Sequence, residues 1–408
     1  MTMIDVMTSK KAMELEDRYG AHNYHPLPVV LARGEGVYVW DVEGKKYFDF
    51  LSAYSAVNQG HCHPRIVQTM IDQARTLTLT SRAFYCDVLG LYEKFVTGFF
   101  GYDKVLPMNT GAEAVETALK LCRKWAYDKK GIPEHKAKII VCEGNFHGRT
   151  ITIISMSTDP DARGGFGPYT PGFVTIPYND LGALAEALEE PNIAGFLVEP
   201  IQGEAGVFVP DEGYLAKAYG LCKAKNVLFI ADEVQTGIAR TGKLLACDHE
   251  QVRPDMLILG KALSGGVYPV SAVLADNEIM MCIKPGQHGS TFGGNPVAAR
   301  VAITALEVIR DEKLADNAAR LGMIFREELK NIKSDMIRLV RGKGLLNAIV
   351  VEPKNGKTAW DVCLKMAENG LLAKPTHEHI IRFAPPLVIN EDQVLEAVNI
   401  IGKSIISF

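Results

Sequence analysis

The sequence has 408 residues, of which 47% are hydrophobic, and a formal net charge of −4 at pH 7. This length suits about two or three globular domains with a sizeable core. The slight charge gives no electrostatic basis for binding nucleic acid or an anionic membrane. No apolar run reaches the roughly 18–20 residues that a membrane helix needs.

The predicted elements begin with a small hairpin around Glu43 and Gly44, at the periphery of the fold. A helix over 111–127 follows. Short apolar strands at 138–142, 194–200, 226–233 and 255–261 then alternate with helices over 181–189 and 213–224. Uninterrupted apolar runs bounded by polar residues are typical of parallel strands that are buried on both faces. The alternation predicts a doubly wound, mostly parallel α/β domain, in which ligands bind outside the carboxyl ends of the strands.

The last hundred residues have a different pattern. Two helices are predicted at about 294–311 and 314–331, followed by an extended stretch at 338–352, a helix near 358–369 and a final helix opened by Asn390. This order predicts a smaller α+β domain. We therefore divide the chain into an N-terminal segment that packs with the small domain (1–54), a large domain that binds the ligand (55–313) and a C-terminal small domain (314–408).

The cysteines and the N-terminus indicate the compartment. Eight cysteines are scattered along the chain and none forms a C-x-x-C pair, so we expect reduced thiols rather than disulfides or structural zinc. The first twenty residues lack the apolar core of a signal peptide and carry several acids, unlike a transit peptide. We expect a cytoplasmic protein, or one of the mitochondrial matrix if a presequence has been removed.

Three of the predicted strands are followed by polar groups. Glu204 lies shortly after the first, Asp232 ends the second and Lys261 follows the third. Because a buried charge without a partner is costly, an internal ion pair between Asp232 and Lys261 is one interpretation. Asp232 and Lys261 are 29 positions apart, which is enough for a β-α-β step between neighbouring strands.

A second interpretation of the same residues explains more. A lysine in a dry pocket has a depressed pKa and can form a Schiff base with an aldehyde, of which pyridoxal phosphate (PLP) is the common cofactor. This cofactor also needs a carboxylate beside its ring nitrogen and an anchor for its phosphate. Asp232 is the obvious carboxylate. Gly111 and Ala112, at the start of a predicted helix, can supply backbone N–H groups to the phosphate.

The spacing of Thr110 and Glu113 matches a capping box, which by itself only begins a helix. The capping box and the phosphate anchor can both be present at this helix start.

Other enzyme classes fit the sequence less well. Residues 237–243 come close to a P-loop, but Leu244 stands where a magnesium ligand is required. HCHP (61–64) and HEH (377–379) have no matching partner cluster, so no metal site is expected. Neither a G-x-S-x-G nor a G-x-G-x-x-G motif is present.

Five motifs occur in order along the chain: GNFHGRT (144–150), VEPIQGEAG (198–206), FIADEVQTGIARTGK (229–243), LGKALSGG (259–266) and GSTFGGNP (289–296). Together they resemble the fold-type I, PLP-dependent aminotransferases of class III, the ω-aminotransferase subgroup. GAHNYHPLPVVLARG (20–34) and DFLSAYSAVNQGHCHP (49–64) are more similar to the ornithine δ-aminotransferase branch. His147 does not favour that branch, because the spelling FHGRT is shared across the subgroup.

The resemblance implies a set of cofactor contacts. Lys261 would form the Schiff base and move the proton, and Asp232 would pair with the pyridinium nitrogen. Gln235 would bind the phenolic oxygen, with Phe146 and Val234 on the two ring faces. The phosphate would be bound by residues from two regions, namely Gly111, Ala112, Ser290 and Thr291. Because Thr291 would come from the neighbouring subunit, the resemblance also implies an obligate homodimer.

The resemblance further implies the substrates, L-ornithine and 2-oxoglutarate. The δ-amino group of ornithine would pass to 2-oxoglutarate, giving glutamate 5-semialdehyde and glutamate. The implied substrate residues are Tyr24, Tyr54, Arg149, Glu204 and Arg382. Arg149 would bind the distal carboxylate and Arg382 the α-carboxylate of glutamate, while Glu204 would neutralise Arg382 when ornithine is bound. N-acetylornithine and 4-aminobutyrate stay open as alternative amino donors.

Overall fold

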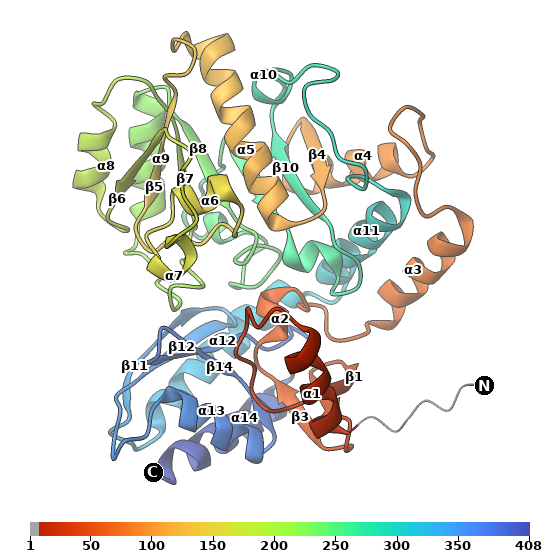
Figure 1. Cartoon of the computed structure of the whole chain (residues 1–408), viewed down its shortest axis with the longest axis vertical. Helices are drawn as coiled ribbons and strands as arrows, with labels where there is room; N and C mark the ends of the chain where they lie inside the picture. Colours follow the sequence, from red (N-terminus) through yellow and green to blue (C-terminus); the bar gives the residue numbers. More distant parts are fainter. Residues whose placement is uncertain (1–7) are drawn as a thin grey trace.

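A seven-stranded sheet forms the larger of two bodies in the computed structural model, which describes residues 8–408 (Figure 1). Part of the N-terminal stretch discussed above therefore lies outside the described residues. The strand order across the sheet is β4 (Lys104–Met108), β10 (Ser271–Ala275), β9 (Met256–Leu259), β8 (Leu228–Asp232), β7 (Ile193–Val198), β5 (Lys138–Cys142) and β6 (Phe173–Ile176). The four predicted strands are confirmed as β5, β7, β8 and β9, and each is parallel to its neighbours among them. β10 is antiparallel to both β4 and β9.

Side chains alternate between the two faces of this sheet, as the period of a strand requires. In β5, Ile139 and Val141 pack into a core with helix α5 (Gly111–Trp125). Ile140 and Cys142 join a second core with α8 (Leu181–Ala187) and α9 (Tyr214–Ala224). Both faces are therefore covered, and the predicted doubly wound α/β architecture is confirmed.

β8 and β9 are neighbouring parallel strands, as their separation in the sequence allows, but no α-helix connects them. The connection contains only a 3-10 helix, Ala246–Glu250. The buried carboxylate of Glu233 holds it by accepting hydrogen bonds from the backbone N–H groups of Ala246 (3.0 Å) and Cys247 (2.8 Å).

The second body lies below the large sheet in Figure 1 and joins the N-terminal and C-terminal parts of the chain. One of its sheets has the order β1 (Leu31–Glu35), β2 (Tyr38–Asp41), β3 (Lys46–Asp49) and β13 (Leu371–Leu372). The other has the order β11 (Ile337–Lys343), β12 (Leu346–Val351), β15 (Ile380–Phe383) and β14 (Lys374–Thr376). The hairpin around Glu43 and Gly44 is confirmed as β2–β3. The parallel pairing of β3 with β13 joins the two ends of the chain, while the domain boundaries at 54 and 313 stay a prediction.

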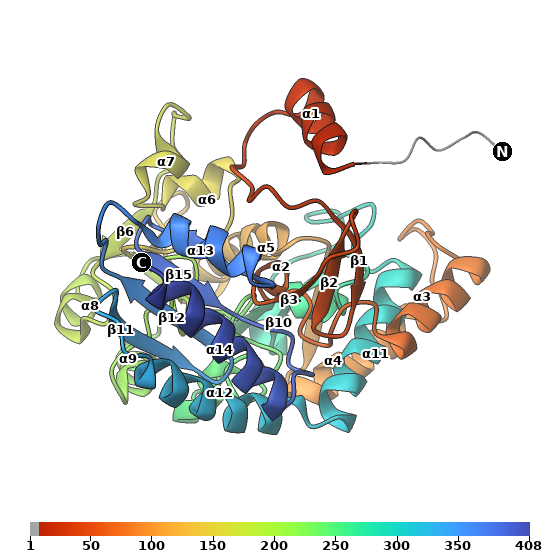
Figure 2. The ribbon, with the colours of Figure 1, turned by 90° about the horizontal axis from the view of Figure 1, so that it is seen from below.

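The remaining helices of eight or more residues are α1 (Ser9–Tyr19), α3 (Pro64–Thr76), α4 (Leu89–Phe100), α11 (Pro296–Asp311), α12 (Leu314–Asn331), α13 (Ala359–Glu368) and α14 (Glu391–Ile406). The four predicted in the last hundred residues are confirmed as α11 to α14. Asn390 caps α14 as predicted. Helix α1 has no buried residue and stands away from the body in Figure 2. Among residues 8–408, none of the helices has both the length and the apolar character that crossing a membrane requires.

Candidate active site

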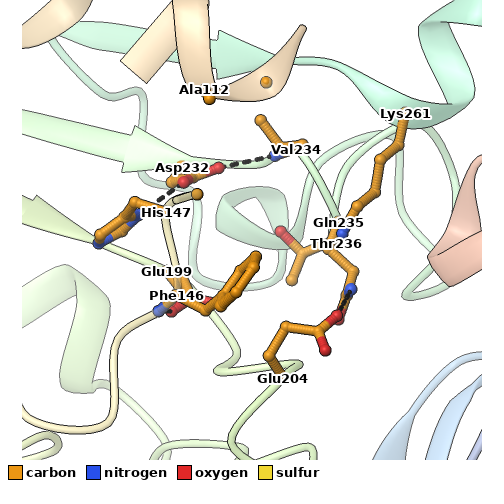
Figure 3. Close-up of a pocket in the computed structure, with 12 residues that line it drawn as sticks. Ala112, Phe146, His147, Glu199, Glu204, Asp232, Val234, Gln235, Thr236 and Lys261 are labelled. Carbon is orange, nitrogen blue, oxygen red and sulfur yellow. Dashed lines mark hydrogen bonds and ion pairs between the residues drawn. The ribbon is translucent and has the colours of Figure 1, made fainter. Parts of the chain in front are cut away.

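The carboxyl ends of β8 and β9 open into a cavity of about 200 Å³ (Figure 3). Eight of the predicted site residues line it: Gly111, Ala112, Phe146, Glu204, Asp232, Val234, Gln235 and Lys261. These come from five separate stretches of the chain. The sheet topology brings them together because parallel strands present their carboxyl ends at one edge.

Lys261 occupies the position just after β9. It is the first residue of a 3-10 helix, Lys261–Ser264, and its φ of 42° lies in the left-handed region that a lysine rarely adopts. Such backbone geometry concentrates at functional sites. Within the described residues, Lys261 Nζ has no hydrogen-bond or ion-pair partner. Burial lowers the pKa of the amine; the charge of Glu204 acts in the opposite direction, and that of Arg382 lowers the pKa further.

Asp232 ends β8 and pairs with a histidine. Its Oδ2 lies 2.6 Å from Nδ1 of His147, and its Oδ1 accepts the N–H of Val234 at 3.0 Å. The first interpretation, an ion pair between Asp232 and Lys261, is therefore wrong: Asp232 contacts His147 and Val234 instead. Burial lowers the pKa of His147, but the hydrogen bond and charge of Asp232 outweigh this effect and raise it above its ordinary value.

Helix α5 begins at the cavity with the predicted capping box. Thr110 Oγ1 accepts the N–H of Glu113 (3.2 Å) and the Glu113 carboxylate accepts the N–H of Thr110 (2.8 Å). The absence of a side chain at Gly111 also has a steric reason, because a Cβ there would lie 3.0 Å from Val234 Cγ1. The N–H groups at this helix start and the helix dipole suit an anion.

A second group of predicted residues meets beside the cavity. Arg382, on β15, forms an ion pair with Glu204 at 2.8 Å and donates to the carbonyl oxygen of Gly203 at 3.1 Å. The Gln235 amide donates to Glu204 Oε1 at 2.8 Å, and its own Oε1 is buried without a partner in the part of the chain that the structure describes. A Cβ at Gly203 would lie 1.5 Å from that oxygen, so a larger residue there would displace the Gln235 amide. Burial raises the pKa of Glu204, but the charges of Arg382 and Lys261 lower it to about 2.

Tyr54 lies against this ion pair, with the Arg382 guanidinium carbon 5.3 Å from its ring centroid. It belongs to a turn, 52–55, in which all four residues have positive φ although none is glycine. Burial raises the pKa of Tyr54, and the charges of Glu204, Arg382 and Tyr24 also act on it. Tyr24 is 69% exposed and does not line the cavity.

The remaining predicted residues lie outside the cavity. The Arg149 side chain is 57% exposed, 3.9 Å from Asp159 and 5.5 Å from the Phe146 ring. Ser290 accepts a hydrogen bond from Asn109 Nδ2 at 2.9 Å and lines a separate surface cavity. Thr291 is exposed. This chain therefore does not bring Ser290 and Thr291 into its own site.

Sequence reasoning missed several residues of the cavity wall: Gly148, Thr236, Glu199 and the contact of His147 with Asp232. Glu199 is 7% exposed and accepts the N–H of Phe146 at 2.8 Å. Burial raises the pKa of Glu199 to about 7, against the lowering effect of the His147 charge. The sequence does offer a signal for Glu199, because this residue directly follows an apolar strand. Asp232 and Lys261 stand at similar positions, at the ends of their own predicted strands.

The residues that line the cavity fit pyridoxal phosphate. An amine without a partner, a carboxylate at a strand end and a glycine-opened helix start are the three groups that this cofactor needs. The unpartnered Oε1 of Gln235 adds a buried polar atom that awaits a neighbour.

Comparison with known proteins agrees with this chemistry. Residues 19–405 match the aminotransferase class-III family. The mitochondrial ornithine aminotransferase of Rattus norvegicus is 63% identical over 98% of this chain and 91% of its own length. The ornithine aminotransferase structure from Toxoplasma gondii superposes with a TM-score of 0.97 at 52% identity, covering 99% of this chain and 95% of that chain. An acetylornithine aminotransferase from Elizabethkingia anophelis superposes with a TM-score of 0.91 at 62% identity, covering 98% of this chain and 100% of that chain.

Proposed function

Because this chain belongs to the class III aminotransferases, we propose that it is a PLP-dependent ornithine aminotransferase. It transfers the δ-amino group of L-ornithine to 2-oxoglutarate, giving glutamate 5-semialdehyde, which cyclises to pyrroline-5-carboxylate, and L-glutamate. One observation carries the proposal most directly: the unpartnered amine of Lys261 and the carboxylate of Asp232 line the same cavity.

The cofactor supplies an aldehyde that condenses with amines and a cationic ring that accepts electrons from the substrate carbon. Lys261 would bond to the aldehyde and would supply the amine that moves a proton at the substrate carbon. Asp232 would pair with the ring nitrogen and favour its protonated form. Gly111 and Ala112 would bind the phosphate together with Ser290 and Thr291 of a neighbouring subunit, Gln235 would bind the phenolic oxygen, and Phe146 and Val234 would enclose the ring.

The two substrates present opposite ends to one pocket. Glutamate reacts at an amine beside a carboxylate, whereas ornithine reacts at a terminal amine with no carboxylate nearby. Arg149 binds the distal carboxylate of either substrate, and Tyr24 and Tyr54 line the pocket. The Glu204–Arg382 pair, closed at 2.8 Å, offers a neutral surface to ornithine and can open for the α-carboxylate of glutamate.

The first prediction tests the reaction itself. Adding L-ornithine to the holoenzyme should convert the absorbance of the aldehyde form of the cofactor into that of its amine form, and 2-oxoglutarate should reverse the change. The kcat/KM for ornithine should exceed those for N-acetylornithine and 4-aminobutyrate, because only ornithine carries the free α-amino group that Tyr24 would contact. A clear preference for N-acetylornithine would assign the chain to the acetylornithine aminotransferases, to one of which it is 62% identical.

The second prediction concerns assembly, because Thr291 would contribute to the phosphate site of another subunit. Two exposed aromatic side chains, Phe84 (71%) and Tyr85 (105%), line the cavity that contains Ser290, and Phe292 (48%) is exposed close to Ser290 in the sequence. Exposed apolar patches of this kind mark protein interfaces. Sedimentation of the holoenzyme should give twice the 44.7 kDa of one chain. A stable and active single chain would rule out a phosphate site shared between subunits.

We place the enzyme in a reducing compartment, the cytoplasm or the mitochondrial matrix. All eight cysteines are free thiols, and six of them are buried. Several curated relatives carry the word mitochondrial in their names.

A further inference from the structure

The turn that carries Tyr54 has a strained backbone. Residues 52–55 have φ values of 48°, 46°, 60° and 72°, and none of them is glycine. Left-handed backbone costs free energy at every residue that has a Cβ. The turn's own side chains offer little in return, because the hydroxyls of Ser52 and Ser55 are buried without a hydrogen-bond partner in the part of the chain that the structure describes. The turn therefore needs support from residues outside it.

Asp49 supplies this support. Its Oδ1 accepts the backbone N–H groups of Leu51 and Ser52, each at 2.9 Å, where the left-handed turn begins. Its Oδ2 lies 2.7 Å from Nε2 of His61. Asp49 is only 8% exposed, so water competes little with these charge-assisted contacts. Both oxygens of the carboxylate are thus used to hold the turn and to fix the carboxylate itself.

The elements around Asp49 are held in place by backbone hydrogen bonds. Asp49 ends β3, which pairs with β2 on one side and with β13 on the other. The main chain of His61 exchanges two hydrogen bonds with that of Gly36, at 2.8 and 3.0 Å. A Cβ at Gly34 would lie 2.9 Å from His61 Cγ, so the imidazole lies directly against β1. The position of the carboxylate is therefore set by the sheet.

Tyr54 meets the substrate residues from this turn. Its ring lies against Arg382, with 5.3 Å between the guanidinium carbon and the ring centroid. Arg382 is buried and pairs with Glu204 at 2.8 Å. A desolvated guanidinium is attracted to the face of an aromatic ring, but only where the ring is held in the right place. The backbone of the turn decides where that ring lies.

We propose that Asp49, held by His61, is a positioning residue that fixes the turn 52–55 and thereby places Tyr54 against Arg382. This inference rests on the proposed function. The same carboxylate has a second, separable effect on the fold. Burial lowers the pKa of Arg240 to about 9, and the charge of Asp49 acts in the opposite direction. Loss of that charge would lower the stability of the protein without moving Tyr54.

The test separates positioning from folding. Asp49→Asn keeps the size of the side chain and removes the charge that strengthens its hydrogen bonds. In the transamination of ornithine, the KM of this variant should rise about tenfold, the equivalent of one charge-assisted hydrogen bond, while kcat stays within about twofold. The kcat is retained because the turn holds none of the groups proposed to bond to the cofactor. A merely structural role would lower the active fraction, and therefore kcat, at an unchanged KM.

Glycine substitutions provide the matched controls. Ala53 is exposed and has a φ of 46°, which glycine adopts without strain. The double variant Asp49→Asn/Ala53→Gly should therefore recover most of the wild-type KM. Ala56→Gly removes the same methyl group at a φ of −85°, where no strain is relieved, and should recover nothing.

A second route keeps the inference falsifiable if Asp49→Asn does not fold. His61→Phe keeps a ring and removes the nitrogen that contacts Asp49 Oδ2, so it should raise the KM in the same direction. In a Tyr54→Ala background, His61→Phe and Asp49→Asn should each cause no further rise, because the residue through which they act is gone.

The possible outcomes distinguish the two proposals. An unchanged KM in the variants of Asp49 and His61, an additive rise in the Tyr54→Ala background, or equal recovery by the two glycine substitutions would overturn the positioning role and leave the transaminase assignment intact. Failure of the wild-type holoenzyme to transaminate ornithine would overturn the proposed function, and this inference with it.

Discussion

Replacing Lys261 with methionine should lower kcat for transamination by about 10⁴-fold or more, because the variant loses the group that bonds to the aldehyde and moves the proton. The half-reaction with ornithine, followed by the absorbance of the cofactor, isolates this step from product release. Lys217→Met serves as the control, since it removes an exposed lysine remote from the cavity. Borohydride reduction of wild-type holoenzyme should fix the cofactor on the peptide that contains Lys261. A label on another lysine would contradict the assignment.

The same variant separates catalysis from stability. The pKa of Lys261 is lowered by burial, so in the folded apoenzyme the charged amine is disfavoured and costs stability as the pH falls. Methionine has a similar length and carries no charge. We therefore expect Lys261→Met apoenzyme to unfold at the same temperature as wild type or higher, as is common where activity requires a strained site. An inactive variant that is also unfolded would not support the catalytic role.

The predictable part of the fold follows from burial. Strands β5, β7, β8 and β9 are covered on both faces, so their sequences are continuous apolar runs that stand out without any other information. Once these strands are known to be parallel, the residues after them must meet at one edge. This is why Glu204, Asp232 and Lys261 could be grouped from sequence although the first and the last are 57 positions apart.

The missed features depend on contacts that no local pattern encodes. The turn at 52–55 has positive φ without any glycine, so nothing in the residues marks it. The connection between β8 and β9 follows an irregular path, because buried Glu233 holds it through backbone N–H groups. The contact of His147 with Asp232 joins residues 85 positions apart.

The ion pair between Glu204 and Arg382 should control which substrate end the enzyme accepts. The Arg382 side chain is only 4% exposed, so without a counter-ion it would be a buried, unpaired charge. Glu204 has a pKa of about 2, lowered by Arg382 and Lys261 against the effect of burial, and stays ionised at neutral pH. Since this pKa is depressed, the pair is fully formed above the ordinary range of a carboxyl group and is lost only as the pH falls towards 2.

Glu204→Ala should therefore leave Arg382 free to attract the α-carboxylate of glutamate. We expect the kcat/KM of the glutamate half-reaction to rise about 10- to 100-fold relative to that of ornithine, the equivalent of one hydrogen-bonded charged contact. Ornithine gains nothing, because its reacting end carries no carboxylate and now meets an unneutralised cation. Rapid-mixing absorbance measures both half-reactions on one enzyme sample.

The control for this substitution is Glu212→Ala, an exposed glutamate a few residues further along the same segment, where the ratio should not change. Two results would count against the pair as a selector. An unchanged ratio in Glu204→Ala would mean that Arg382 does not meet the α-carboxylate. Equal losses in both half-reactions would mean that Glu204 acts only by holding Gln235, whose amide it accepts at 2.8 Å.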